Sequence, residues 1–166
     1  SLLGCECLGD LKGFAERLKA DLEAENIEVF MDNNPALGKL CGGDDWEIKL
    51  ERGIEVSKWM VLLMTQHSVR RPDGFCLNEV AYARNVGKPI VPIMVQQVNP
   101  PLSIARIQYI DMEGFFRPAL ESLNEDAYER KKTELIEILK GLSELRYEGT
   151  QGSLSYHLNP IDNDVY

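Results

Sequence analysis

Cysteine and histidine, the side chains that most often bind metals or act as nucleophiles, occur at spacings that indicate no such site. None of the four cysteines forms a CxxC pair, and the two histidines, His67 and His157, lie at no zinc-like spacing from them. Cys5 and Cys7 flank a glutamate, but such a pair is more typical of small apolar residues in or near a strand. We therefore expect free thiols, no metal, and the reducing environment of the cytoplasm.

Glycine-rich phosphate-binding motifs are also missing. Gly38, Gly42 and Gly43 precede an expected helix, but they lack the spacing of a Walker or Rossmann loop. Residues 33–43 are therefore interpreted as a long flexible loop, and no bound cofactor is expected. The pair Arg70-Arg71 could meet a pyrophosphate, although arginines in a polar loop are more often simply solvated.

Helical periodicity appears in four segments. Each has an apolar stripe at i, i+3 and i+4 spacing with polar residues on its other face. They lie at residues 11–25, 44–57, 75–86 and 125–145. Asp73 is the expected cap of the third helix, and Gly87 is expected to end it.

Strand patterns lie between these helices. Residues 59–64 and 89–95 are continuously apolar, which is typical of strands buried on both faces. Residues 27–31 and 108–112 predict two further strands, and a weak one precedes the first helix. This alternation predicts an α/β fold of three layers, in which a central parallel sheet of about five strands is flanked by helices. Ligands of such sheets bind at the carboxyl ends of the strands.

The chain is acidic, but unevenly so. It has 27 acidic and 18 basic residues and a net charge of −9, which argues against nucleic acid or an anionic membrane as a partner. Residues 58–112 are nevertheless net +3, whereas residues 1–57 are −7 and residues 113–166 are −5. No apolar run is long enough to span a membrane. Residues 1–146 form the expected domain, and residues 147–166 have the composition of a polar tail or linker.

Four motifs in a fixed order resemble the Toll/interleukin receptor (TIR) domain family. They are a strand ending in aspartate at 27–32, a helix ending in Ile54-Glu55-Val56-Ser57, a buried strand ending in threonine at 61–65, and Phe75-Cys76-Leu77-Asn78-Glu79 followed by Ile90-Val91-Pro92-Ile93. The last motif is similar to the "WC..E" and "IIPI" pattern of the family. The resemblance covers roughly residues 8–145 and implies the flavodoxin-like TIR fold.

The resemblance implies a catalytic role for Glu79. In TIR domains that cleave NAD, the glutamate of "WC..E" is the catalytic residue, and Glu79 occupies its position. Breaking the nicotinamide–ribose bond develops positive charge on the ribose, which a carboxylate can stabilise. The leaving group is already cationic and needs no acid, so one carboxylate suffices. The alternative without a catalytic role is that Glu79 is a solvated residue on a surface helix.

The same resemblance suggests residues for binding NAD. Asp32 is expected to line the cleft together with Ser57 or Thr65, and Phe75 stands where the family usually has tryptophan. Asp32 is equally well explained as a turn former and Phe75 as a core residue. Residues 3–10 depart from the family, because they lack its usual aromatic residue and arginine. Asp10 alone is carried over there.

The leading hypothesis is thus an NAD glycohydrolase that is active when several copies assemble, with NAD as its substrate and other TIR domains as partners. The product is ADP-ribose or a cyclic isomer. A second hypothesis is a TIR scaffold without catalysis that associates through the 33–43 loop. A third, more distant, is a nucleoside deoxyribosyltransferase-like enzyme, which shares the sheet order and a catalytic glutamate.

Overall fold

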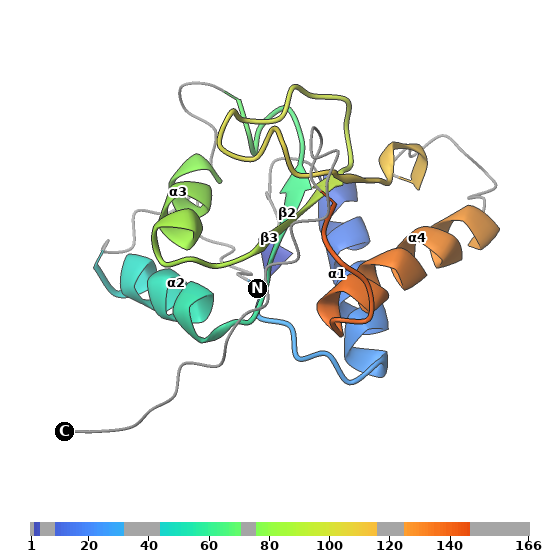
Figure 1. Cartoon of the computed structure of the whole chain (residues 1–166), viewed down its shortest axis with the longest axis horizontal. Helices are drawn as coiled ribbons and strands as arrows, with labels where there is room; N and C mark the ends of the chain where they lie inside the picture. The colour runs from blue at the N-terminus through green and yellow to red at the C-terminus, as the bar shows by residue number, and fades with distance from the viewer. Residues whose placement is uncertain (1, 4–8, 32–43, 71–75, 116–124, 147–166) are drawn as a thin grey trace.

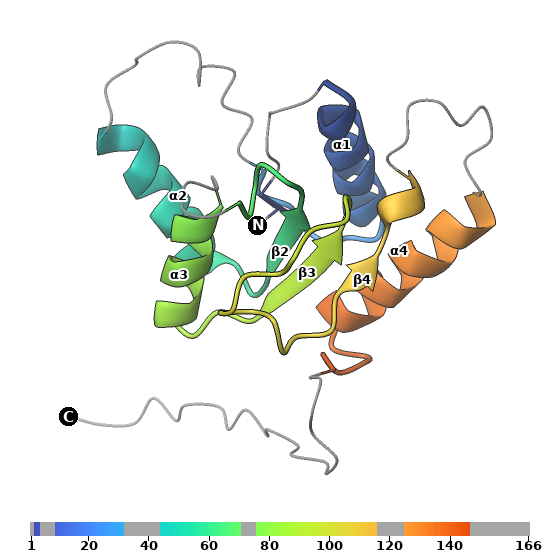
Figure 2. The same ribbon diagram turned by 90° about the horizontal axis from the view of Figure 1, so that it is seen from above.

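The computed structural model describes residues 2–3, 9–31, 44–70, 76–115 and 125–146. Figure 1 shows a central sheet between two pairs of helices, and Figure 2 shows the same three layers from above. The strands are β1 (Leu2–Leu3), β2 (Met60–Met64), β3 (Ile90–Met94) and β4 (Ile110–Asp111). The helices are α1 (Gly9–Ala24), α2 (Asp44–Val56), α3 (Leu77–Asn85), α4 (Glu125–Leu139) and the 3-10 turn η1 (Glu113–Phe115).

The strands pair in the order β1-β2-β3-β4, and every pair is parallel. In the centre of the sheet Val61 lies opposite Val91, and Leu63 lies opposite Ile93. All residues of β2 and β3 are buried, as their continuous apolar runs predict. The predicted α/β architecture with a parallel sheet flanked by helices is confirmed.

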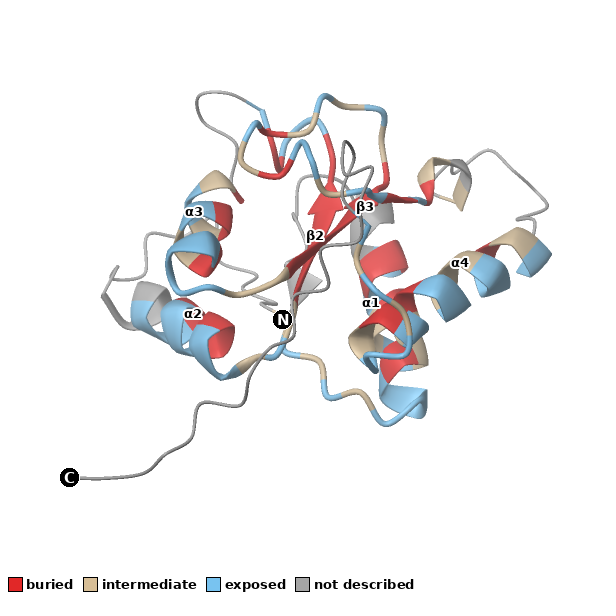
Figure 3. Cartoon of the chain, in the orientation of Figure 1, coloured by how far each residue is buried: buried red, intermediate tan, exposed pale blue. Residues whose placement is uncertain are grey.

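The two faces of the sheet hold separate core clusters. Val61 and Leu63 pack with α1 and α4, whereas Leu62 and Met64 pack with α2 and α3. Successive side chains of a strand point to opposite faces, so a continuously apolar strand supplies both clusters. In Figure 3 the buried residues lie on the sheet and on the helix faces turned toward it.

The strand predicted at residues 27–31 is the main correction to the fold. Residues 27–30 have no regular secondary structure, and Met31 forms a single bridge. The described sheet has β1 and β4 at its edges, and residues 27–30 belong to none of its strands. The apolar alternation instead serves packing, because Ile27, Val29 and Met31 lie against the core cluster of α1 and α4.

The two ends of α3 show one prediction confirmed and one wrong. Gly87 ends the helix as expected: it has φ of +70°, its N–H donates to the Arg84 carbonyl, and the next N–H donates to the Ala83 carbonyl. The N-cap, however, is Cys76, whose own side chain makes no capping bond, and not Asp73, which lies outside the described residues. The Cys76 N–H donates to the Ser68 carbonyl at 2.9 Å, so a contact with the loop after β2 sets where the helix begins.

Among the helices that the structure describes, none combines the length and apolar character needed to cross a membrane. The polar segment predicted for residues 147–166 lies outside the described residues, as does the 33–43 loop.

Candidate functional site

A buried network of hydroxyl groups closes the loop that follows β2. Thr65 and Ser68 are both buried, and Ser68 is 0% exposed. The Ser68 Oγ donates to the Leu63 carbonyl at 2.9 Å and accepts the Thr65 N–H at 2.8 Å. The Thr65 Oγ1 in turn accepts the Ser68 N–H at 3.1 Å. These bonds provide hydrogen-bond partners for the Leu63 carbonyl and for the Thr65 and Ser68 N–H groups at the carboxyl end of the strand.

The same network positions the start of α3. The Ser68 carbonyl accepts the Cys76 N–H at 2.9 Å, and the Cys76 carbonyl accepts the Val80 N–H at 3.0 Å. Cys76 and Val80 are buried in the cluster that also contains Met64. The first turn of α3 is therefore held against the carboxyl end of β2.

Glu79 lies in that first turn. Its side chain is partly buried, and the carboxylate oxygen Oε2 is fully enclosed by protein. A negative charge in the first turn is stabilised by the helix dipole, because the free N–H groups there carry partial positive charge. The carboxylate is thus placed at the edge of the sheet where parallel α/β folds bind ligands, and it can stabilise a developing cation.

The loop after β3 reaches the same edge. The N–H groups of Val95 and Gln96 both donate to the Met64 carbonyl, at 3.1 and 3.2 Å. The Gln96 Oε1 accepts the Gln66 N–H at 3.2 Å, which ties the two loops together. Hydrogen bonds therefore link the carboxyl ends of β2 and β3 to each other and to the start of α3.

Ser57 is not brought to this edge. It follows α2 and precedes β2, so it lies at the amino end of the strand whose carboxyl end carries the Thr65–Ser68 loop. A strand of five residues separates the two ends by about 16 Å. The Ser57 Oγ donates to the Gly53 carbonyl at 2.5 Å, which is a local contact at the helix end. The expectation that Ser57 lines the cleft of Glu79 is therefore corrected.

The structure does not describe the side chains of the other predicted site residues. Asp10 is the second residue of α1, and its side chain is outside the described part. Asp32 and Phe75 also lie outside the described residues.

Ser68 is a residue that the sequence interpretation missed. Its signal is the Thr-x-x-Ser spacing directly after a buried strand, because hydroxyl side chains often bond to nearby backbone groups in such turns.

Comparison with known families agrees with this geometry. The family model described as "TIR domain" matches residues 9–125, which is more than half of the chain. The chain belongs to the TIR domain family. No curated protein matches this TIR domain.

Two solved TIR structures resemble the fold. The TIR domain of the Toll-related receptor TRR-2 from Hydra magnipapillata superposes with a TM-score of 0.53 at 17% identity, covering 84% of this chain and 97% of that one. The TIR domains of the activated Roq1 resistosome, which directly recognises the pathogen effector XopQ, give a TM-score of 0.55 at 13% identity, covering 81% and 97%. At these identities the likeness concerns the fold alone.

Proposed function

We propose that this TIR domain is an NAD glycohydrolase with Glu79 as its catalytic residue. The observation that carries the proposal is the position of Glu79, a partly buried carboxylate in the first turn of α3 at the carboxyl edge of the sheet. Membership of a family that includes NAD-cleaving enzymes supports it. The net charge of +3 in residues 58–112 favours the approach of a dianionic pyrophosphate.

The chemistry requires one bond to break and one to form. The bond between the nicotinamide nitrogen and the ribose carbon breaks, its electron pair leaves with nicotinamide, and the ribose becomes an oxocarbenium-like cation. The Glu79 carboxylate stabilises this cation through charge and through hydrogen bonds from the ribose hydroxyls. Attack by water gives ADP-ribose and a proton, and attack by the adenine of the same molecule gives a cyclic isomer.

Fixed placement of the carboxylate is part of the proposal. A group that already lies where charge develops needs no reorganisation during the reaction. Ser68 holds the first turn of α3 in place, because its Oγ donates to the Leu63 carbonyl and its carbonyl accepts the Cys76 N–H. Asp32, Phe75 and Asp10 are proposed to bind the rest of NAD, as the family motifs suggest.

Activity is proposed to require several copies in contact, with the 33–43 loop of one copy completing the site of the next. The Roq1 TIR domains come from an activated resistosome, which is consistent with action in an assembly. We place the reaction in cytoplasmic immune or cell-death signalling.

The decisive experiment replaces Glu79 with glutamine, which keeps the shape of the side chain and removes its charge. Glu79→Gln is expected to lower nicotinamide release from NAD by at least about a hundredfold, the scale of losing a group that stabilises transition-state charge. The melting temperature should change little, because a charge near a helix N-terminus contributes only about 0.3–1 kcal/mol.

Asn78→Ala is the matched control, since Asn78 is exposed in the same turn of α3. It should retain nicotinamide release. Undiminished turnover by folded Glu79→Gln at high protein concentration would contradict the assignment, and release of free base from nucleosides without NAD cleavage would favour the deoxyribosyltransferase-like reaction.

A TIR scaffold without catalysis is the second candidate. The observation that favours it is the departure of residues 3–10 from the family pattern, where neither an aromatic residue nor an arginine occurs. For a scaffold, Glu79→Gln would be silent in an association assay, whereas Pro35→Ala or Gly38→Ala would weaken association. Chromatography coupled to light scattering on these three variants, read beside nicotinamide release, separates the two candidates.

A further inference from the structure

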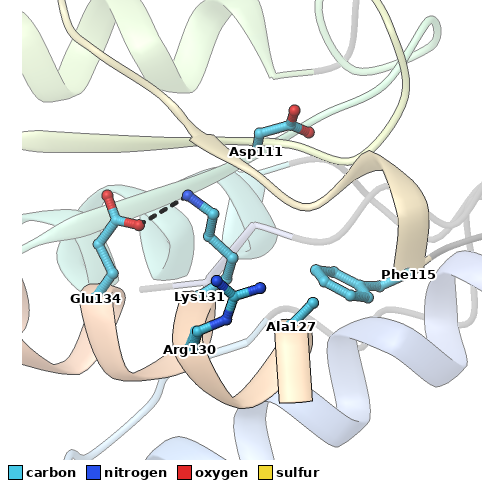
Figure 4. A pocket seen from close by; sticks show the side chains of 6 residues that line it. All are labelled: Asp111, Phe115, Ala127, Arg130, Lys131 and Glu134. Carbon is cyan, nitrogen blue, oxygen red and sulfur yellow. Dashed lines mark hydrogen bonds and ion pairs between the residues drawn. The ribbon is translucent and has the colours of Figure 1, made fainter. Parts of the chain in front are cut away.

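The face of the sheet opposite α3 carries a pocket that the proposed NAD cleavage does not use. It has a volume of about 410 Å³ and lies between α4 and the segment from β4 to η1 (Figure 4). Its lining comes from the carboxyl end of β4, from η1 and from the part of α4 between Ala127 and Glu134. The lining residues are Asp111, Phe115, Ala127, Arg130, Lys131 and Glu134.

Arg130 differs from Lys131, the other cation that lines the pocket, in its ion pairing. On α4, Lys131 is paired with Glu134 at 3.0 Å and Lys132 with Glu129 at 2.7 Å. Arg130 makes no ion pair with any residue in the part of the chain that the structure describes. Figure 4 shows its guanidinium directed toward the pocket wall that contains Phe115 and Ala127. A guanidinium in this setting is suited to bind a phosphate or carboxylate with two parallel hydrogen bonds.

The wall that contains Phe115 is apolar and packs against Tyr128. The partly buried Phe115 ring meets the Tyr128 ring edge-on, with centroids 5.7 Å apart and planes at 82°. Tyr128 is fixed in turn, because its hydroxyl donates to Asp21 Oδ2 at 2.7 Å and Arg17 lies 4.1 Å above its ring. A preformed wall lowers the entropy that a ligand loses on binding, and an aromatic side chain beside a cation is suited to a flat ring that bears an anion.

Acceptor groups complete the pocket. Asp111 and Glu134 line the pocket with exposed carboxylates; the Asp111 Oδ1 already accepts the Glu113 N–H at 3.0 Å, and Glu134 Oε2 pairs with Lys131 at 3.0 Å. A ligand that contacts Arg130, Phe115 and the two carboxylates must therefore offer an anionic group, a flat ring and hydrogen-bond donors. An inorganic anion satisfies the first condition alone, whereas a nucleoside monophosphate satisfies all three.

We propose that this pocket is a second site, separate from Glu79, that binds a nucleoside monophosphate. The phosphate contacts Arg130, the base lies against Phe115 and Ala127, and the hydroxyl or amino groups donate to the Asp111 and Glu134 carboxylates. The volume falls in the usual range for small-molecule pockets. The place also suits a ligand, because Asp111 is the last residue of β4 and parallel α/β sheets bind ligands at the carboxyl ends of their strands.

The test is calorimetric titration of the full chain with AMP, adenosine and inorganic phosphate. All titrations use the Glu79→Gln background, in which the proposed catalytic carboxylate is absent. AMP is expected to bind with 1:1 stoichiometry and more tightly than either fragment. Arg130→Gln should weaken AMP by at least about tenfold, as expected for loss of a charge-assisted hydrogen bond, and should leave adenosine unchanged. Lys140→Gln is the matched control, because Lys140 is a cation just after α4 that pairs with Glu25 at 2.9 Å.

Three outcomes would overturn the proposal: no saturable AMP binding in the millimolar range, AMP binding that Arg130→Gln and Lys140→Gln weaken equally, or phosphate binding as tight as AMP. None of these readouts depends on NAD cleavage. AMP binding that requires Arg130 would therefore stand even if nicotinamide release were absent, and loss of AMP binding would leave the role of Glu79 untouched.

Discussion

Arg17 and Glu125 join the middle of α1 to the start of α4 through a bidentate ion pair. The Arg17 Nη2 lies 2.6 Å from Glu125 Oε2, and Nη1 donates to Oε1 at 3.3 Å. The hydrogen bond from Arg17 lowers the pKa of the Glu125 carboxyl below its ordinary value, with the Coulombic attraction of the same guanidinium adding to it. Burial, followed by the hydrogen bond to Asp21, raises the pKa of Tyr128 beside this pair. Charged and aromatic groups thus fasten the two helices that cover one face of the sheet.

This pair predicts an acid-sensitive contribution to stability. Because the folded-state pKa of Glu125 is lowered from 4.5, the stabilisation is complete above that pH and is lost as the pH falls through the folded-state value. Glu125→Gln should therefore lower the melting temperature by a few degrees at pH 7, and the difference from the parent should shrink toward zero near pH 3. Differential scanning fluorimetry across this pH range measures the difference directly.

Glu144→Gln is the control for that measurement. Glu144 is exposed just after α4 and forms no ion pair with any other described residue. Its melting temperature should follow the parent at every pH. A difference between Glu125→Gln and the parent that stays constant from pH 7 to pH 3 would refute the linkage argument.

At the scale of elements, the ends of α3 carry the argument for function. Its start is fixed by the Ser68 contact, and its end is fixed by Gly87, whose φ of +70° allows the closing hydrogen bonds of the helix. The Lys88 Nζ also donates to the Glu55 carbonyl at 3.0 Å, and the Tyr82 hydroxyl donates to Glu55 Oε1 at 2.6 Å. These contacts hold α3 against α2, so the helix that carries Glu79 is constrained at both ends.

Two glycine substitutions should have opposite effects. Gly87→Ala is expected to cost about 1 kcal/mol, because a side chain strains the left-handed backbone. Gly13→Ala, in α1, is expected to stabilise the fold by about 0.5–1 kcal/mol, because alanine has less backbone freedom to lose. An added Cβ would meet nothing within 4 Å at either position, so the backbone alone sets the sign. Urea unfolding of both variants tests the pair; destabilisation by Gly13→Ala would contradict the backbone argument.

At the scale of the whole molecule, the net negative charge opposes the assembly of several copies. A net charge of −9 makes each copy repel the next, although residues 58–112 are net positive. If activity requires copies in contact, nicotinamide release should rise more steeply than protein concentration. It should also rise with salt, since the Debye length shrinks from about 30 Å at 0.01 M to about 8 Å at 0.15 M.

The measurement is the initial rate at saturating NAD over a hundredfold range of protein concentration, at both salt concentrations. Saturating substrate separates the effect on assembly from weaker NAD binding in salt. Pro35→Ala, in the loop proposed to contact the neighbour, should lower the rate most at low protein concentration. A rate strictly proportional to protein concentration would show that a single copy suffices.

Prediction from sequence succeeded where the physical cause is local. The apolar runs at 60–64 and 90–94 form buried strands, and the amphipathic segments form helices. In both cases the pattern of apolar residues along a short stretch of sequence determines which side chains are buried. Gly87 ends its helix for an equally local reason. The apolar alternation of Ile27, Val29 and Met31 indicated burial, but it did not distinguish a strand from an extended segment packed on the core.

The sequence by itself determined the α/β class, the two buried central strands and the order of motifs that marks a TIR domain. Tertiary structure decided where α3 begins, because the donor to Ser68 is Cys76 across a loop. It also created the pocket, which joins Asp111 to Arg130 across two elements. Local propensity fixes which face a residue buries, whereas contacts between distant segments exist only after the sheet and its helices have packed.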